Sequence, residues 1–274
     1  MERVGEHPLK AGPLAVRWLA HKVEPPRAGI TGRARLVLGN AGSATWRARG
    51  ETGVRLAYHW LDPLGNAIVW DGIRTAFPRA IAPGETVEID IPVEAPRPPG
   101  GYVLSFDLVE EFRFWFADIG SATLDVPTEV GSRIAERRLE VVVLGGRDPE
   151  TTSALSAQEE ALVENDAVAV AYLCSGAVPA PDWSRLLLDA HAEGWAAVGG
   201  AVEPVARRDR GRFGAWAPGS GRNPHFGSPL LFPSLLDGIK PGEHEGLPAY
   251  NGVDGLFDGR AVVRLRPQSG RRPG

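Results

Sequence analysis

The sequence predicts a two-domain protein, in which an all-β, immunoglobulin-like sandwich is followed by a partial α/β domain. Two observations support this fold class. Residues 13–126 alternate apolar and polar side chains and are interrupted by turn residues about every 8–12 positions. Residues 139–202 instead alternate continuous apolar runs with helix-like segments. A chain of 274 residues with 43% hydrophobic side chains is long enough to bury a core in each half.

Three runs of the first half show the alternation of half-buried strands. Residues 54–60 place Val54, Leu56, Tyr58 and Trp60 on one face, and residues 87–93 and 102–108 repeat the pattern. Turn-forming stretches separate such runs: "GNAG" (39–42), "DPLGN" (62–66), "APGE" (82–85) and "PRPPGG" (96–101). We expect roughly seven to nine short antiparallel strands, the number typical of an immunoglobulin-like sandwich, within residues 1–127.

The second half, residues 139–274, follows a predicted linker at 128–138 and has the pattern of an α/β layer. Continuous apolar runs are typical of buried parallel strands. The expected elements are strands at 139–146, 167–173 and 195–202, a helix at 151–164, and a second helix that begins after Asp182 as its cap and stops at Gly194. Residues 203–250 are rich in Gly, Pro and Arg and predict loops.

The composition excludes several classes of function. The net charge of −4 is spread along the chain, so we expect no nucleic-acid partner. A single cysteine excludes an intramolecular disulfide framework and a cysteine-based zinc site. Neither an apolar signal segment nor a run long enough to span a membrane is visible. We therefore expect a cytoplasmic protein, with peripheral membrane association left open.

One segment of the second half resembles a known enzyme family. Residues 172–204, "YLCSGAVPAPDWSRLLLDAHAEGWAAVGGAVEP", are similar to the central segment of family 2 glycosyltransferases of the GT-A type. The matching residues, in the family's order and spacing, are Val178-Pro179, Pro181-Asp182-Trp183 and Val198-Gly199-Gly200. The flanking stretches "LEVVVLGGRDPETT" and "LPAYNGVDGLFDG" are similar to the family's second strand and its acceptor-side segment. The resemblance covers residues 139–260 and implies a truncated GT-A-type domain.

The sequence departs from this family at the residues that carry its chemistry. In the family, an Asp-x-Asp motif binds a divalent cation that neutralises the diphosphate leaving group. Here Cys174-Ser175-Gly176 stands at that position, and Gly145-Gly146-Arg147-Asp148 replaces the family's Asp-Asp-Gly-Ser. The family's first strand and catalytic-base segment are missing. We therefore expect no cofactor and no divalent metal.

The same resemblance assigns candidate site residues in the second half. Glu203 follows the strand that ends in Gly-Gly, and Asp254 and Asp258 lie near the acceptor-like Asn251, so these three carboxylates are the candidates for a surviving catalytic acid or base. The candidates for contact with a ligand are Asp148, Cys174, Ser175, Gly176 and Asn251.

The first half is similar, over residues 58–85 and 98–120, to β-sandwich modules found beside bacterial glycosyltransferases. Its aromatic residues divide into two kinds. Trp60 is in phase with the apolar face of its strand and is expected in the core. In "FRFWF" (112–116), alternation sends the three phenylalanines one way and Trp115 the other, so Trp115 faces outward if the phenylalanines are core. Trp115, together with Trp70 near a strand end, is a candidate for stacking on a sugar.

These patterns lead to one main hypothesis and two alternatives. The main hypothesis is an accessory, non-catalytic protein of bacterial surface-glycan assembly that binds a glycan, a sugar nucleotide or a partner glycosyltransferase. The first alternative is an active, metal-independent glycosyltransferase in which arginines such as Arg147, Arg207 or Arg222 stabilise the leaving group. The second is a structural interaction module built around the sandwich. Fold alone does not decide among them.

Overall fold

The computed structural model describes residues 1–3, 12–48, 53–144, 146, 148–174, 176–204 and 255–265. The chain divides into two compact units, Met1–Ser132 and Arg133–Gly274. Each unit has its own hydrophobic cluster, and each is described by itself.

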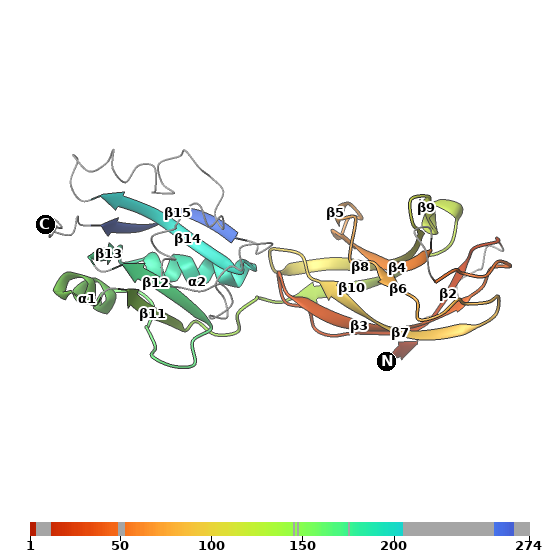
Figure 1. The fold of residues 1–274 in the computed structure, drawn as a ribbon, viewed down its shortest axis with the longest axis horizontal. Coiled ribbons are helices and arrows are strands. Elements are labelled where there is room, and N and C mark those ends of the chain that lie inside the picture. Colours follow the sequence, from red (N-terminus) through yellow and green to blue (C-terminus); the bar gives the residue numbers. More distant parts are fainter. Residues whose placement is uncertain are drawn as a thin grey trace, which may run out of the picture. The chain divides into compact units, whose positions relative to one another are not determined.

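The first unit contains two antiparallel β-sheets (Figure 1). One sheet has the order β1-β2-β3-β7, with strands at Glu2–Arg3, Val16–Val23, Thr31–Asn40 and Thr86–Glu94. The other has the order β10-β8-β4-β5, with strands at Leu124–Val130, Gly100–Glu110, Val54–Leu61 and Ala67–Val69. Two short strands complete the second sheet: β6 (Thr75–Ala76) pairs with β4, and β9 (Phe114–Trp115) pairs with β8. The predicted sandwich-like β fold is therefore present.

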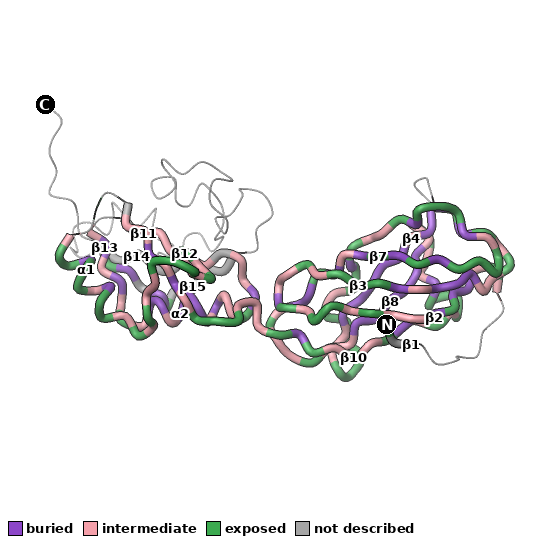
Figure 2. Tube along the Cα trace, turned by 90° about the horizontal axis from the view of Figure 1, so that it is seen from below, coloured by how far each residue is buried: buried purple, intermediate pink, exposed green. Residues whose placement is uncertain are grey.

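One core fills the space between the two sheets. Alternate residues of β4, including Leu56 and Trp60, are fully buried, and so are Leu104 and Phe106 of β8. Residues of β3 and β7 belong to the same cluster, and buried segments run along the strands within the sandwich (Figure 2). Burial of each large apolar side chain contributes about 1.5–3 kcal/mol relative to exposure. The prediction that Trp60 is a core residue is confirmed.

Strand β10 continues to Val130, into the segment that the sequence suggests as a linker. Residues 128–130 pair with Gly100, Gly101 and Tyr102 of β8, so they complete the edge of the second sheet. The division between the two compact units falls after Ser132. Asp125 and Glu129 are exposed on this edge strand, and the mixture of polar residues and proline gives its sequence the character of a linker.

The second unit combines a parallel strand pair, a three-stranded sheet and two helices (Figure 1). Strands β11 (Leu139–Leu144) and β12 (Ala169–Cys174) pair in parallel, as their continuous apolar runs predict. Strand β15 (Gly255–Leu265) lies between β13 (Ala177–Pro179) and β14 (Ala197–Pro204), antiparallel to β13 and parallel to β14. The described elements are a mixed α/β arrangement, and the truncated GT-A-type domain stays a prediction from the sequence.

Helix α2 (Trp183–Glu193) forms nearly where the sequence places it. Trp183, Leu186, Leu187 and Ala190 are buried on one face, and Gly194 ends the helix with a left-handed backbone. Asp182 occupies the predicted N-cap position but does not cap the helix through its side chain. Its backbone is not extended, its side chain makes no cap hydrogen bond, and its carboxylate instead lies 3.5 Å from Arg185.

The helix predicted at 151–164 is shorter and starts earlier. Helix α1 spans Pro149–Ser156, with its N-cap at Asp148. Just beyond its C-cap, Gln158 donates side-chain hydrogen bonds to the carbonyls of Ala154 and Ala180. Leu162, expected on the helix, instead forms an isolated bridge with Leu139 of β11. No helix in the described part of the chain is long and apolar enough to cross a membrane.

Candidate functional site

The outward face of the second sheet of the sandwich carries polar side chains that are nevertheless buried. His59 of β4 lies opposite Ser105 of β8, and Ser105 lies opposite Asp125 of β10. His59 is only 4% exposed, Ser105 3% and Asp107 0%. The hydroxyl of Ser105 donates to the carboxylate of Asp125 at 2.6 Å. Polar residues on an outward face are covered only if something packs on top of them.

Two tryptophans cover this face. The indole of Trp70 stacks on the His59 ring, with centroids 4.2 Å apart and planes inclined by 24°. Trp115 meets His59 edge-on at 4.3 Å and Trp70 edge-on at 6.0 Å. The Trp70–Trp115 distance falls in the usual range for aromatic pairs, and the two contacts with His59 are closer. We refer to His59, Trp70 and Trp115 as the aromatic platform.

Trp70 is held by a close approach of its own segment to strand β4. The carbonyl of Trp70 accepts a hydrogen bond from Nδ1 of His59, and the amide of Gly72 donates to the carbonyl of Tyr58 at 2.9 Å. A Cβ atom at position 72 would lie 2.4 Å from that carbonyl oxygen and 2.6 Å from the Tyr58 ring. Only glycine lets the backbone come this near.

Trp115 is positioned by the short strand β9 and the 3₁₀ helix η1 (Ala117–Ile119) that follows it. It lies opposite Val109 of β8, so its ring is on the outward face. The carboxylate of Asp118 accepts a hydrogen bond from the Trp115 amide at 3.1 Å. Asp107, under the sheet surface, accepts from the amide of Ala117 at 3.2 Å. Two carboxylates therefore hold the backbone at Trp115 and just after it.

Arg74 joins the two tryptophan segments. Its guanidinium lies 4.7 Å from the centre of the Trp115 ring. It also pairs with Asp71 at 2.8 Å and Glu111 at 3.5 Å, and donates to the carbonyl of Gly72 at 2.9 Å. A cation over an indole adds to such a network, and the planar guanidinium can satisfy several acceptors at once. The platform is thus preorganised from both sides.

Burial shifts two titratable groups beneath the platform. Desolvation lowers the pKa of His59, with the positive charge of Arg74 acting in the same direction, so the ring is neutral at physiological pH. Desolvation raises the pKa of Asp107 to about 7, and the nearby charges of Asp118 and Asp125 add to the effect.

The arrangement offers a flat apolar surface to solvent. Trp70 remains 52% exposed although one side of its ring is covered by His59. An indole fixed from behind loses little conformational freedom when a ligand stacks on its open side. Charged hydrogen-bonding groups, Asp71 and Arg74, lie beside it. This combination suits a ligand with one apolar face and a polar rim.

The structure therefore brings together two of the residues that the sequence singles out, Trp70 and Trp115. The expected alternation of "FRFWF" holds in part. Phe116 is fully buried and Phe114 packs against the core, but Phe112 is 88% exposed at a turn with a φ angle of 62°. Alternation fails there because the chain reverses between β8 and β9.

Sequence reasoning missed His59 and Arg74. A signal for His59 was available, because it alternates with Tyr58 and Trp60 and so must point away from the core. Arg74 carries no comparable signal, since two of its partners, Glu111 and Trp115, lie far from it in the sequence.

In the second unit, the structure brings Asp148 and Gly176 together. One carboxylate oxygen of Asp148 accepts from the amides of Glu150 and Thr151, both at 3.0 Å, and so caps helix α1. The other accepts from the Gly176 amide at 2.8 Å and the Thr151 hydroxyl at 2.7 Å. These hydrogen bonds, led by those from Thr151, lower the pKa of Asp148 to about 2.

The other candidates of this unit are placed only by their backbones or lie outside the described residues. Cys174 ends β12 opposite Leu144. Asp258 of β15 lies opposite Gly200, and Glu203 of β14 opposite Arg264. Ser175, Asn251 and Asp254 are outside the described part of the chain, as are the arginines considered for charge stabilisation, Arg147, Arg207 and Arg222. Among the residues that the structure describes, no three His, Cys, Asp or Glu side chains converge on a possible metal position.

Comparison with solved structures finds limited similarity. The chain is similar to the C-terminal domain of Wzt, with a TM-score of 0.31 and 9% identity over 43% of this chain and 75% of that one. It is similar to a family 123 glycoside hydrolase from Clostridium perfringens described in relation to glycolipid glycan hydrolysis, with a TM-score of 0.24 and 13% identity over 48% of this chain and 26% of the hydrolase. A third similarity is to the putative ApaA protein of Bordetella pertussis, with a TM-score of 0.21 and 17% identity over 43% of this chain and 92% of that one.

No protein-family model and no curated protein matches the chain. The resemblance to family 2 glycosyltransferases accordingly stays a prediction from the sequence. Similarities with TM-scores of 0.31 and below carry no argument about function.

Proposed function

We propose that the chain is an accessory, non-catalytic protein of bacterial surface-polysaccharide assembly whose first unit binds a glycan on the aromatic platform. The observation that carries the proposal is the half-exposed indole of Trp70, stacked at 4.2 Å on a buried His59. A tryptophan that stays 52% exposed, between the His59 ring and the edge of Trp115, stabilises the fold little for its size. Its orientation is more readily explained by a ligand.

Glycans fit this surface better than other ligand classes. A pyranose ring has one face of C–H groups and an edge of hydroxyl groups, which match an indole face and neighbouring charged side chains. The carboxylate of Asp71, the residue after Trp70, accepts hydrogen bonds. The guanidinium of Arg74, which lies over the Trp115 ring, donates them. Nucleic acid also stacks on aromatic rings, but it requires a basic surface, and the chain carries a net charge of −4.

The second unit has an accessory role in this proposal. Its sequence resembles a glycosyltransferase segment in which the metal-binding carboxylates are replaced by Cys174-Ser175-Gly176. The carboxylate of Asp148, which contacts the amide of Gly176, accepts four hydrogen bonds from its own surroundings and has little capacity left for a cation. We infer that this unit contacts a sugar nucleotide or a partner transferase without transferring sugar itself.

Two experiments test these two parts. The full chain is applied to an array of immobilised bacterial glycans, and selective binding that is lost in Trp70→Ala is expected. Separately, calorimetric titration with UDP- and GDP-sugars, with and without Mn²⁺, is expected to show no metal-dependent binding and no transfer. Tight Mn²⁺-dependent binding, or sugar transfer without metal, would refute the accessory role and favour an active transferase.

A further inference from the structure

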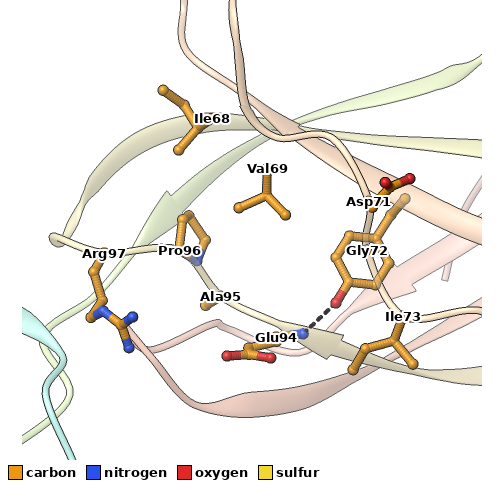
Figure 3. A pocket seen from close by; sticks show the side chains of 10 residues that line it. Ile68, Val69, Asp71, Gly72, Ile73, Glu94, Ala95, Pro96 and Arg97 are labelled. Atoms are coloured by element: carbon orange, nitrogen blue, oxygen red, sulfur yellow. Dashed lines mark hydrogen bonds between the residues drawn. The ribbon is translucent and has the colours of Figure 1, made fainter. Parts of the chain in front are cut away.

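A cavity of about 320 Å³ opens in the first unit beside the segment that carries Trp70. One wall is formed by the end of β5 and the residues after it, and the other by the end of β7 and the residues after it (Figure 3). The lining residues are Tyr58, Ile68, Val69, Asp71, Gly72, Ile73, Glu94, Ala95, Pro96 and Arg97.

The cavity is rigidly built where its two walls meet. The hydroxyl of Tyr58, from β4, accepts a hydrogen bond from the amide of Glu94 at 2.8 Å. The indole of Trp60 donates to the carbonyl of Glu94, also at 2.8 Å. Because Tyr58 and Trp60 are fully buried in the core, these bonds fix the end of β7 against the second sheet.

The lining combines apolar and charged side chains. Ile68, Val69 and Pro96 form an apolar part of the wall, whereas Asp71, Glu94 and Arg97 place charges around the opening (Figure 3). Two carboxylates and one guanidinium supply hydrogen-bond acceptors and donors in the same small space. This is the mixture that a single sugar ring requires, and the volume lies at the lower end of the range for ligand pockets, roughly 300–1,000 Å³.

The cavity and the aromatic platform share one structural element. Trp70 belongs to the platform, while its neighbours Val69 and Asp71 line the cavity. Asp71 pairs with Arg74, and Arg74 lies over the Trp115 ring, so a chain of direct contacts joins the two features. A ligand that occupied both would lie across the segment of residues 69–71.

We propose that the cavity and the aromatic platform are two subsites of one binding site for a neutral oligosaccharide. One sugar unit enters the cavity while another unit of the same chain stacks on Trp70. Neutral sugars are preferred over uronic acids because the charges at the cavity balance. Asp71 pairs with Arg74, Glu94 and Arg97 have opposite signs, and no excess positive charge offsets an added carboxylate. This inference rests on the proposed glycan-binding function and adds the minimum length and the charge of the ligand.

The test uses the full chain with isotope-labelled isoleucine methyl and tryptophan indole groups, assigned through Ile68→Val, Ile73→Val and Trp70→Phe. Neutral oligosaccharides of increasing length, built from glucose, mannose or galactose, are titrated and followed by NMR. A bound chain of two or more units is expected to shift the indole signals of Trp70 and Trp115 and the methyl signals of Ile68 and Ile73 together. Indole shifts without methyl shifts would overturn the two-subsite proposal and leave glycan binding intact. If neutral sugars and uronates alike move neither set of signals, the proposed function itself is contradicted.

A pair of variants tests the cavity independently. Ile73→Trp fills the cavity, and Leu64→Trp adds the same indole at a fully exposed turn position that lines neither subsite. Ile73→Trp is expected to weaken binding of the oligosaccharide at least tenfold, while Leu64→Trp leaves it unchanged. In Glu94→Gln, oligogalacturonate should bind more tightly than it does to the wild-type chain. Unchanged affinities in both cavity variants would contradict the proposal.

Discussion

His59 and Trp70 form a stacked pair with ring centroids 4.2 Å apart, one ring buried and the other half exposed. This pair fixes the direction of the indole before any ligand arrives. The buried histidine contributes shape and one hydrogen bond to the carbonyl of Trp70, and its role is that of a positioning residue.

His59→Phe should separate the stabilising effect of ring stacking from the pH-dependent effect of histidine protonation. Phenylalanine preserves the stack but loses the hydrogen bond, at a cost of about 0.5–1.5 kcal/mol in the free energy of unfolding at neutral pH. The pKa of His59 is depressed in the folded state, so the stability it contributes is complete above the ordinary pKa of 6.5 and is lost as the pH falls below it. Urea unfolding at pH 7.5 and pH 5 should show a smaller loss on acidification in the variant. An equal or larger loss would contradict this role for His59.

Gly72→Ala should destabilise the first unit and weaken ligand binding together. The added Cβ would lie 2.4 Å from the carbonyl oxygen of Tyr58, whose backbone is fixed within β4. Relief of the clash must lift the segment that carries Trp70, and overpacking of this kind costs about 1–3 kcal/mol. Thermal unfolding and glycan titration measure the two effects. The matched control is Gly65→Ala, at an open turn position where only the positive φ of 88° is strained. A variant with wild-type affinity would show that the close approach is not needed.

Asp107→Asn should change the pH dependence of stability. The folded protein holds the proton of Asp107 up to a pKa of about 7, whereas the unfolded chain releases it near 3.8. The stability due to this proton is therefore present in full below pH 4 and is lost as the pH rises to 7 and above. Relative to wild type, the variant should gain on the order of 2–4 kcal/mol in unfolding free energy between pH 4 and pH 8.

When Asp107→Asn is compared with wild type, the contribution of the histidines to the pH dependence of stability cancels. His59 and His191 also have depressed pKa values, and they act in the opposite direction over part of this range. Both proteins carry these residues, so the difference between them isolates Asp107. A difference that does not change with pH would show that folding does not raise the pKa of Asp107.

Asp148→Ala should lower the melting temperature of the second unit and leave glycan binding by the first unit unchanged. The substitution leaves the amides of Glu150, Thr151 and Gly176 without their acceptor. Asp148→Asn, which keeps one acceptor oxygen, should recover part of the loss. Since the pKa of Asp148 is about 2, its contribution is present above pH 4 and is lost as the pH falls through 2. A melting temperature equal to that of wild type would contradict the capping role.

Much of the first unit was predictable because its strands alternate strictly. The period of two in residues 54–60 and 102–108 identifies the buried faces of β4 and β8 correctly. The contact between Trp70 and Trp115 was not predictable, because it depends on how two irregular segments fold onto the same sheet. Alternation within each segment says that these rings face outward and cannot say that they meet.

In the second unit, the local sequence pattern indicated a helix start that the prediction did not use. Asp148 is followed by Pro149 and Glu150, the pattern of a capped helix start, and the structure has a helix there. The family resemblance instead suggested that Asp148 contacts a ligand. Strand β15 escaped prediction because its partners lie far away in the sequence, and β-strands depend on such partners more than helices do.

The central claim is that a glycan stacks on Trp70, and calorimetric titration of the full chain tests it most directly. The ligand is the glycan that the array identifies, measured against wild type, Trp70→Ala, Trp115→Ala and the control Leu64→Ala, which removes a still more exposed apolar side chain away from the platform. Loss of a stacking contact worth about 1.4 kcal/mol weakens binding tenfold. We predict a loss of at least that size in both tryptophan variants and none in Leu64→Ala. Binding that stays at the wild-type level in Trp70→Ala would contradict the account.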